Sequence, residues 1–312
     1  MEENVPVIYA APLQGFTETA WRNAHAQSFG GVDAYYTPFI RLEKGEIRNK
    51  DKRGVSPGEN TVPRLIPQII ASEPDELEKL VTFLMIQGYR EIDLNMGCPF
   101  PLIVRRGKGS GILSHPEKVA ALLEAMKTFP EVCFSVKMRL GWENAEEWRK
   151  VLPLLNRSCV KQVTLHPRIG KQQYKGVVDM EAFRRFYEAC ELPLVYNGDL
   201  CTVTAVREIL EAYPRLKGVM LGRGLLADPS LAKAFREELM SEDEIKARTF
   251  RMHRLMYLYY QRIIEGGDAQ LLTKLKAIWE YLLPDLDKKV RKAILKSNRL
   301  DTYLRAVEDA LG

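Results

Sequence analysis

Cysteine is scarce in this chain, with five residues among 312, and no two of them form a CxxC pair. A disulfide framework uses an even set of closely spaced cysteines, and a structural zinc site uses ligands in short clusters. The odd number and wide spacing argue against both as the basis of the fold. We therefore expect reduced thiols and no metal.

Long apolar runs are missing as well. No stretch reaches the roughly 18 to 20 apolar residues of a membrane helix. The N-terminal sequence MEENVP also lacks the basic segment that begins a secretory signal. We expect a cytoplasmic protein with no membrane segment. The net charge of +5 permits a polyanionic partner without requiring one.

What the chain does contain is a repeating unit. Short apolar segments alternate with amphipathic stretches of helical spacing, which is typical of parallel strands covered by helices on both faces. The apolar segments span residues 7–13, 33–39, 64–70, 91–97, 133–139, 161–167, 192–198 and 218–224. Eight such units favour an α/β fold, a closed (β/α)8 TIM barrel over residues 1–238. A doubly wound open sheet is the alternative, although no GxGxxG opens the first helix.

The pattern changes in residues 241–312, where helical spacing continues without strands. Four amphipathic segments predict a small all-α domain, and they span residues 241–267, 268–283, 285–297 and 300–311. This part holds 14 Lys and Arg against 11 Asp and Glu, with the densest basic cluster at 288–299. Such a cluster fits either a solvated helix face or a nucleic-acid contact.

Polar side chains gather where the predicted strands end. The chemistry of a TIM barrel lies at the carboxyl ends of its strands. The residues there are Pro12, Gln14, Thr37, Phe39, Gln68, Asn95, Cys98, Lys137, Arg139, His166, Arg168, Asn197, Asp199, Gly222 and Arg223. Lys137 interrupts an apolar strand, and a buried ammonium is unfavourable unless an anion or a ligand compensates it. The glycines of YNGDL and LGRGLLADP, with Arg223, predict a site for a phosphate-bearing cofactor.

Cys98 lies in Asn-Met-Gly-Cys-Pro, between a strand and a loop that carries Arg105, Arg106 and Lys108. A free cysteine is commonly a small buried apolar residue. Cys133, Cys159, Cys190 and Cys201 lack a special setting and are expected to be packing or bystander residues. The setting of Cys98 favours a reactive thiol instead. The three bases are expected to lower its pKa.

Several stretches together resemble the tRNA dihydrouridine synthases, flavoenzymes that reduce uridines of tRNA. They are AAPLQGFTETAWR, PQIIASEPDEL, DLNMGCP, GKGSGILSHP, VKMRLGW, TLHPRIGKQQYKG, NGDL and GRGLLADP. Leu13 stands where members commonly have Met, and Pro167 follows His166 where a Gly is common. Pro167 removes a backbone donor beside the expected flavin site.

The resemblance implies that FMN donates a hydride to uracil C6, that Cys98 protonates C5, and that NADPH recharges the flavin. It implies FMN-binding roles for Pro12, Leu13, Gln68, Lys137, His166, Asn197, Gly198, Asp199, Gly222 and Arg223. Together with the positions of the basic residues, the resemblance implies contacts with the RNA substrate. The candidates are Asn95, Arg105, Arg106, Lys108, Arg139, Lys171, Lys175, Lys292, Lys296 and Arg299, and also Lys288, Lys289 and Arg291 of the same basic cluster. If tRNA phosphates neutralise the bases near Cys98, its thiol stays protonated in the complex. Residues 241–312 would bind tRNA.

Two other functions remain open at this level. The first is an FMN barrel dehydrogenase that acts on a free pyrimidine or another small molecule. The second is a tRNA-binding chaperone that holds flavin without turnover. Replacing Cys98 by Ala separates catalysis from binding. The target uridine, the preference for NADPH over NADH and the oligomeric state are not specified by these patterns.

Overall fold

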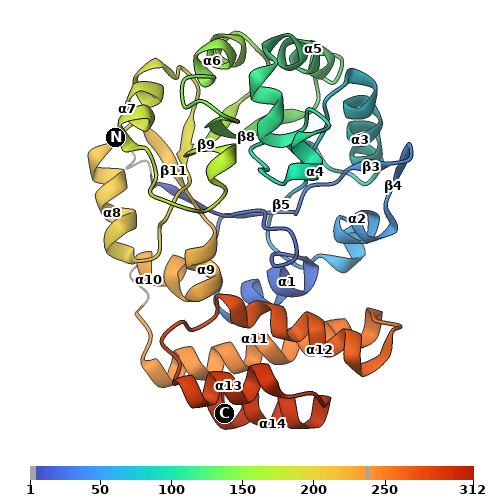
Figure 1. The fold of residues 1–312 in the computed structure, drawn as a ribbon, viewed down its shortest axis with the longest axis vertical. Helices are drawn as coiled ribbons and strands as arrows, with labels where there is room; N and C mark the ends of the chain where they lie inside the picture. The colour runs from blue at the N-terminus through green and yellow to red at the C-terminus, as the bar shows by residue number, and fades with distance from the viewer. Residues whose placement is uncertain (1–4, 237–238) are drawn as a thin grey trace.

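The computed structural model describes residues 5–236 and 239–312, which form a barrel followed by a layer of helices (Figure 1). One parallel sheet runs in the order β5-β2-β1-β11-β10-β9-β8-β7-β6. Its strands are β1 (Val7–Ala10), β2 (Ala34–Tyr36), β5 (Leu65–Ile66), β6 (Gln68–Ile69), β7 (Glu91–Met96), β8 (Cys133–Gly141), β9 (Gln162–Ile169), β10 (Leu194–Tyr196) and β11 (Leu216–Leu221). The predicted end of the barrel domain, residue 238, lies outside the described residues.

The third predicted strand closes the barrel. It is divided at Pro67 into β5, which pairs with β2, and β6, which pairs with β7. Proline has no backbone N–H to give to a ladder, and the division falls at this residue. One short segment therefore joins both ends of the sheet. The eight predicted strands and the TIM barrel are confirmed, and the open sheet is not.

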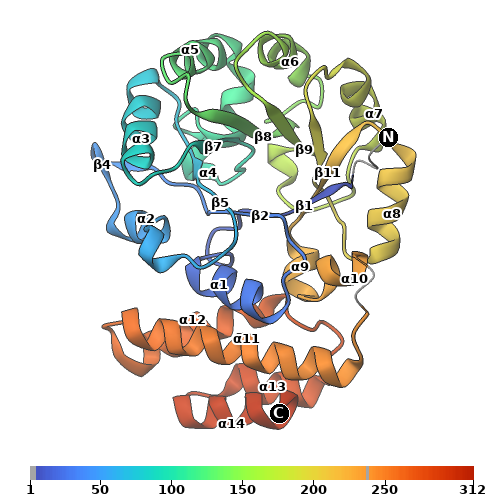
Figure 2. The same ribbon diagram turned by 180° about the vertical axis from the view of Figure 1, so that it is seen from behind.

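Helices surround the strands, as Figure 1 and the reverse view in Figure 2 show. They are α1 (Thr19–Ser28), α2 (Asn49–Gly54), α3 (Pro74–Ile86), α4 (Pro101–Val104), α5 (Pro116–Met126), α6 (Trp148–Asn156), α7 (Met180–Ala189), α8 (Val203–Ala212), α9 (Arg223–Ala227) and α10 (Leu231–Phe235). A hairpin of β3 (Leu42–Glu43) and β4 (Glu46–Ile47) precedes α2 and was not predicted.

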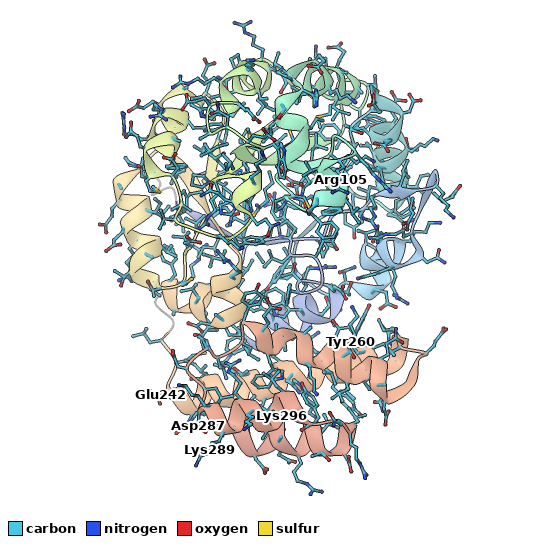
Figure 3. All side chains as sticks on the ribbon, in the orientation of Figure 1. Arg105, Glu242, Tyr260, Asp287, Lys289 and Lys296 are labelled. Carbon is cyan, nitrogen blue, oxygen red and sulfur yellow. The ribbon has the colours of Figure 1, made fainter. Side chains whose placement is uncertain are left out.

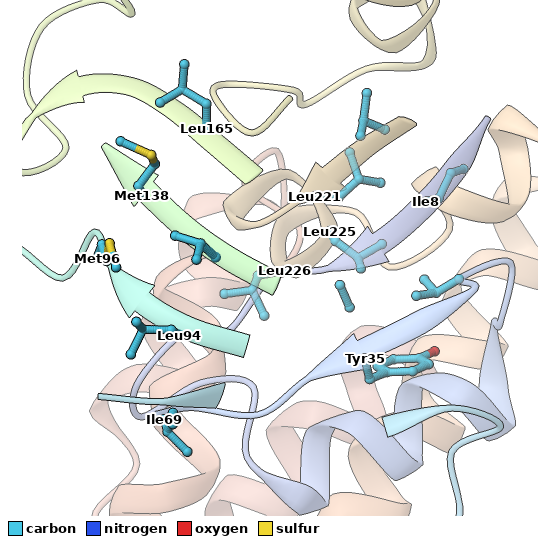
Figure 4. Close-up of a cluster of buried hydrophobic side chains, with 14 of the residues drawn as sticks. Ile8, Tyr35, Ile69, Leu94, Met96, Met138, Leu165, Leu221, Leu225 and Leu226 are labelled. Atoms are coloured by element: carbon cyan, nitrogen blue, oxygen red, sulfur yellow. The ribbon is translucent and has the colours of Figure 1, made fainter. Parts of the chain in front are cut away.

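Side chains alternate between two apolar clusters along the strands. Ile8 packs outward against the helices, and its neighbour Tyr9 packs inside the barrel with Tyr36 and Met220. Figure 4 shows the outward cluster, which contains Ile8 and Leu165. This alternation follows from the two-residue period of a strand. At the β1–β11 seam a Cβ on Gly218 would lie 2.0 Å from the Val7 carbonyl oxygen, so glycine is required there.

The chain after the barrel forms α11 (Glu242–Ile263), α12 (Gly267–Ala277), α13 (Lys288–Lys296) and α14 (Leu300–Leu311), as the sequence predicts. Of these helices α11 lies against α1, and α13 and α14 lie on the side of α11 that faces away from the barrel (Figure 1). Lys274 places its Nζ 3.1 Å from an oxygen of Glu18, and the Leu283 N–H donates to the Ala227 carbonyl at 2.9 Å. No helix in the described part of the chain is long and apolar enough to span a membrane.

Candidate active site at the carboxyl ends of the strands

A cavity opens at the carboxyl ends of the strands, and with the open space at its mouth it has a volume of about 900 Å³. It brings together most of the predicted site residues. Those that line it are Pro12, Leu13, Asn95, Cys98, Lys137, Arg139, His166, Asn197, Gly198, Asp199, Gly222 and Arg223. They come from strands far apart in the sequence, and closure of the barrel places them around one space.

Gln68 does not line the cavity. It is fully buried, and its Oε1 accepts a hydrogen bond from Asn95 Nδ2 at 2.8 Å. Its Nε2 donates at 2.7 Å to Asp93, which also accepts from Ser135 Oγ at 2.6 Å. Gln68 therefore supports Asn95, and its predicted contact with the edge of the flavin ring stays a prediction.

Asp93 is a residue that the sequence analysis overlooked. Burial raises its pKa to about 6, although the hydrogen bonds from Ser135 and Gln68 oppose the shift. As a carboxylate it can only accept hydrogen bonds, so it orients the Gln68 amide, and Gln68 in turn orients Asn95. Its position two residues before Asn95 on β7, facing the same side, is the signal that could have identified it.

We expect Asp93→Asn to stabilise the fold by roughly 1 to 3 kcal/mol at pH 7. The folded pKa of about 6 exceeds the ordinary aspartate pKa of 3.8, so the folded state binds more protons between these values and loses stability as pH rises through them. The amide removes this penalty and can still accept from Gln68. Urea unfolding of both proteins at pH 7 and pH 4 measures the change in the free energy of unfolding. An equal increase at both pH values would show that ionisation of Asp93 is not its cause.

The backbone at Cys98 is held from both sides. Asn95 Oδ1 accepts the N–H groups of Gly97 at 3.0 Å and Cys98 at 2.8 Å. The Cys98 carbonyl accepts from both the N–H and the Oγ of Ser110, each at 3.0 Å. Gly109 has φ +59°, and a Cβ on it would come within 2.5 Å of the Cys98 carbonyl oxygen. Only glycine fits this approach, so the thiol has a defined position at the cavity wall.

Burial raises the pKa of the half-buried Cys98 thiol. The bases that oppose this shift are Arg139, Lys137 and Arg41. The expected lowering by Arg105, Arg106 and Lys108 is therefore wrong for the protein without RNA. The thiol is protonated at neutral pH, as a proton donor must be.

The cavity carries an excess of positive charge. Burial, reinforced by Arg139, lowers the pKa of Lys137 to about 8, and no carboxylate of the described residues lies within ion-pair distance of its Nζ. Burial and the nearby cations also lower the pKa of His166 well below its usual value. His166 is therefore neutral, and its Nε2 accepts from Arg168 Nη1 at 2.9 Å.

Asp199 is the acidic residue among those that line the cavity. Its backbone is in the left-handed region, with φ +46°. It forms ion pairs with Arg168 at 2.5 Å and with Arg223 at 2.8 Å. The exposed ring of Tyr174 lies near both Arg139 and Arg223, whose guanidinium carbons are 5.4 and 4.9 Å from its centroid. Tyr174 was not predicted, although it belongs to the stretch 164–176 on which the resemblance rests.

The residues predicted to contact RNA differ in their exposure and in whether they already form an ion pair. Arg105, Arg106, Lys171, Lys175, Lys292, Lys296 and Arg299 are exposed. Lys171 pairs with Glu143, and Arg299 with Asp301. Figure 3 places Arg105 on the barrel, and Lys289 and Lys296 on the helical layer.

Two other predicted contacts have structural roles. Lys108 is buried, and its Nζ lies 2.5 Å from Glu76, so it is unavailable to a phosphate. The predicted phosphate contact at Lys108 is therefore corrected. Arg291 donates to the carbonyls of Trp279 and Leu282 at the end of the preceding helical segment.

A second cavity lies between the barrel and the helical layer. Gln14 lines both cavities, so the two adjoin. Lys50 and Arg53 of α2 and Lys274 of α12 contribute cations to its wall. The basic run RNKDKR at 48–53 was the sequence signal for this surface.

The residues of the first cavity fit a flavin mononucleotide. Lys137 offers an ammonium without an anionic partner, and Arg139 and Arg223 add donors. The first N–H groups of α9 have no acceptor within the helix, which suits a phosphate beside Gly222 and Arg223. One wall of the cavity is polar, and another carries the apolar side chains of Leu13 and Met220. Such a cavity suits a ligand that has a flat ring and a charged tail.

Comparisons with known proteins match nearly the whole chain to one family. The family model for Dihydrouridine synthase (Dus) matches residues 9–300. A probable tRNA-dihydrouridine synthase of Staphylococcus epidermidis is 27% identical over 290 residues, which cover 84% of this chain and 86% of that protein. The tRNA-dihydrouridine synthase B of Pasteurella multocida is 25% identical over 244 residues, covering 76% of this chain and 71% of that protein.

Two solved structures share the barrel at low sequence identity. Morphinone reductase aligns with a TM-score of 0.51 and 12% identity over 77% of this chain and 88% of its own. Histamine dehydrogenase from Rhizobium sp. 4-9 aligns with a TM-score of 0.54 and 12% identity over 80% of this chain and 48% of its own. These two show the fold alone. Because the family model covers both the barrel and most of the helical layer, the chain belongs to the dihydrouridine synthase family of oxidoreductases.

Proposed function

We propose that this enzyme reduces uridine in tRNA to 5,6-dihydrouridine, with FMN as its cofactor and NADPH as the reductant. The observation that carries the proposal is a protonated thiol, Cys98, held rigidly in a cation-rich cavity beside Lys137 and Arg139. Two relatives whose names specify tRNA-dihydrouridine synthase support the substrate.

The chain's own residues supply an acid and a set of hydrogen-bond donors. Bound FMN, once reduced, supplies the hydride that uracil C6 accepts. Electron density then moves to C5 and to the C4 carbonyl oxygen. Cys98 delivers its proton to C5, and Lys137 and Asn95 face the cavity as donors for the carbonyl. The neutral His166 can donate from Nδ1, because its Nε2 is already accepting.

The cofactor is held by residues from strands at opposite sides of the barrel. Pro12, Leu13, Lys137, His166, Asn197, Gly198, Asp199, Gly222 and Arg223 surround it, with Gln68 acting through Asn95. Pro167 lies on β9 just beyond His166, and it removes one N–H from this wall. The side chains of Arg139 and Arg223 provide donors that do not depend on that N–H.

RNA binding has to offset the unstacking of the target uridine, which costs a few kcal/mol. Arg105, Arg106, Lys171 and Lys175 form the basic mouth of the barrel. Residues 241–312 act as the tRNA-binding domain through Lys292, Lys296 and Arg299, with Arg53 beside the second cavity. An enzyme with this substrate works in the cytoplasm.

The test is to incubate the protein with NADPH and an unmodified tRNA transcript, then with bulk tRNA from a strain lacking this gene, and to map dihydrouridine by position. We expect new dihydrouridine at a defined position. If NADPH bleaches a bound flavin but both RNAs stay unreduced, the tRNA assignment fails. Reduction of free uracil in the same assay would establish a small-molecule dehydrogenase instead.

A further inference from the structure

Phe100 is exposed immediately beside the active cysteine. Its exposed fraction is 55%, and it is the one exposed phenylalanine in the part of the chain that the structure describes. An aromatic side chain this exposed forgoes the large stabilisation that burial of its ring would give. Leu102, with an exposed fraction of 60%, lies on the same short turn. An aromatic and an aliphatic side chain therefore face solvent within four residues of Cys98.

The backbone holds Phe100 in this position. Proline follows it and precedes it, and its φ of −67° and ψ of 125° are the extended values that a residue before proline adopts. Its carbonyl accepts the N–H of Ile103 at 2.9 Å and of Val104 at 3.0 Å. Ile103 is buried in one cluster with Phe39 and Ile70, which anchors the turn. The exposed ring thus stands on a fixed support.

The ring stands outside the cavity. Cys98 and Pro99 line the cavity, whereas Phe100 does not, so it is no part of the cofactor site. Arg105 and Arg106, both exposed, follow within two turns, and Figure 3 shows Arg105 on this face of the barrel. An exposed ring that follows the cavity-lining Cys98 and Pro99 in the sequence and precedes two exposed arginines suits a nucleotide, which presents an aromatic base and phosphates together. A purely apolar partner would leave the two arginines unmatched.

We propose that Phe100 stacks on the base next to the target uridine and fills the space that the uridine vacates as it enters the cavity. The inference rests on the proposed function, since it requires an RNA substrate. Extruding one base leaves its neighbour with an uncovered face, and an apolar side chain inserted there restores stacking. Phe100 is thus a positioning residue that favours the extruded state of the RNA, and Arg105 and Arg106 contact the flanking phosphates.

The test compares Phe100→Ala, Phe100→Trp and the control Ile86→Ala, which truncates an exposed apolar residue at the end of α3. We expect Phe100→Ala to lower kcat/KM for tRNA about tenfold or more, the range of a lost base stack. Phe100→Trp should retain activity, and its added indole fluorescence should be quenched by tRNA. Flavin content and NADPH oxidation without RNA should be unchanged in all three.

The outcomes separate the two proposals. If wild-type protein binds and reduces tRNA while Phe100→Ala matches it and the indole fluorescence added by Phe100→Trp does not respond to RNA, stacking is overturned and the proposed function stands. If wild-type protein neither binds nor reduces RNA, both fail together. A loss in Phe100→Ala that Phe100→Trp restores, with quenched fluorescence, supports the stack, because a merely structural defect would not respond to RNA.

Discussion

Replacing Cys98 by Ala is expected to lower dihydrouridine formation by about 10² to 10⁴ while flavin reduction by NADPH continues at its normal rate. The thiol lies at the cavity wall as the proposed proton donor, and burial keeps it protonated. Alanine removes the proton without adding bulk. Single-turnover reduction of tRNA, measured beside NADPH-dependent bleaching of the flavin, separates the two half-reactions.

Cys201 offers a matched control because it lines the same cavity and is also a free thiol. Cys201→Ala should leave both half-reactions unchanged. If Cys98→Ala formed dihydrouridine at the wild-type rate, another group would be the acid, and the proposed role would be lost. Dihydrouridine formation by the wild-type protein, lost in Cys98→Ala while tRNA binding is retained, would exclude a chaperone that never turns over.

Replacing Lys137 by Met is expected to weaken flavin binding by about 10- to 100-fold and to stabilise the flavin-free fold. A hydrogen bond to a charged group contributes about 1.5 to 3 kcal/mol, which sets the loss in affinity. Without a ligand the ammonium is half-buried and has no carboxylate partner, and its pKa falls to about 8. Methionine has a similar shape and no charge, so the two effects should have opposite signs.

The pH dependence gives a second measurement on Lys137. Its folded pKa of about 8 lies below the ordinary lysine pKa of 10.5, so the unfolded chain binds more protons between these values. Stability of the flavin-free protein should therefore rise with pH across this interval, and flavin affinity should fall above pH 8 as the ammonium loses its proton. Titration of the flavin-free protein with FMN at pH 7 and pH 9 measures this, with the exposed Lys171→Met as control. Equal affinities at both values would show that Lys137 does not meet an anionic group.

The fold could be predicted because its signals are local. Continuous apolar segments separated by amphipathic stretches predict parallel strands and covering helices, and the third segment was recognised although Pro67 divides it. The hairpin of β3 and β4 was missed because its strands are two residues long and carry charges, which do not form an apolar pattern. The four helices after the barrel were recognised by their spacing.

The sequence predicted most of the residues that line the cavity, and it predicted their hydrogen-bond and ion-pair partners less well. Strand ends converge in a barrel, so the position of Cys98, Lys137 and His166 around one space follows from topology. Lys108 was misassigned because its partner Glu76 is 32 residues away on another helix. The hydrogen bond that Gln68 accepts from Asn95 was not foreseen, because the two residues are 27 positions apart in the sequence.

Three features of the sequence were enough to predict the barrel, the family and a reactive thiol at Cys98. They are the order of the apolar segments, the Asn-Met-Gly-Cys-Pro element and the glycines of the last strands. These properties reside in neighbouring residues. Tertiary structure alone decided the protonation of Cys98, the direction of the Asp93, Gln68 and Asn95 hydrogen bonds, and the exposure of Phe100. Each depends on burial and on partners from distant strands, because desolvation and charge act through space and not along the chain.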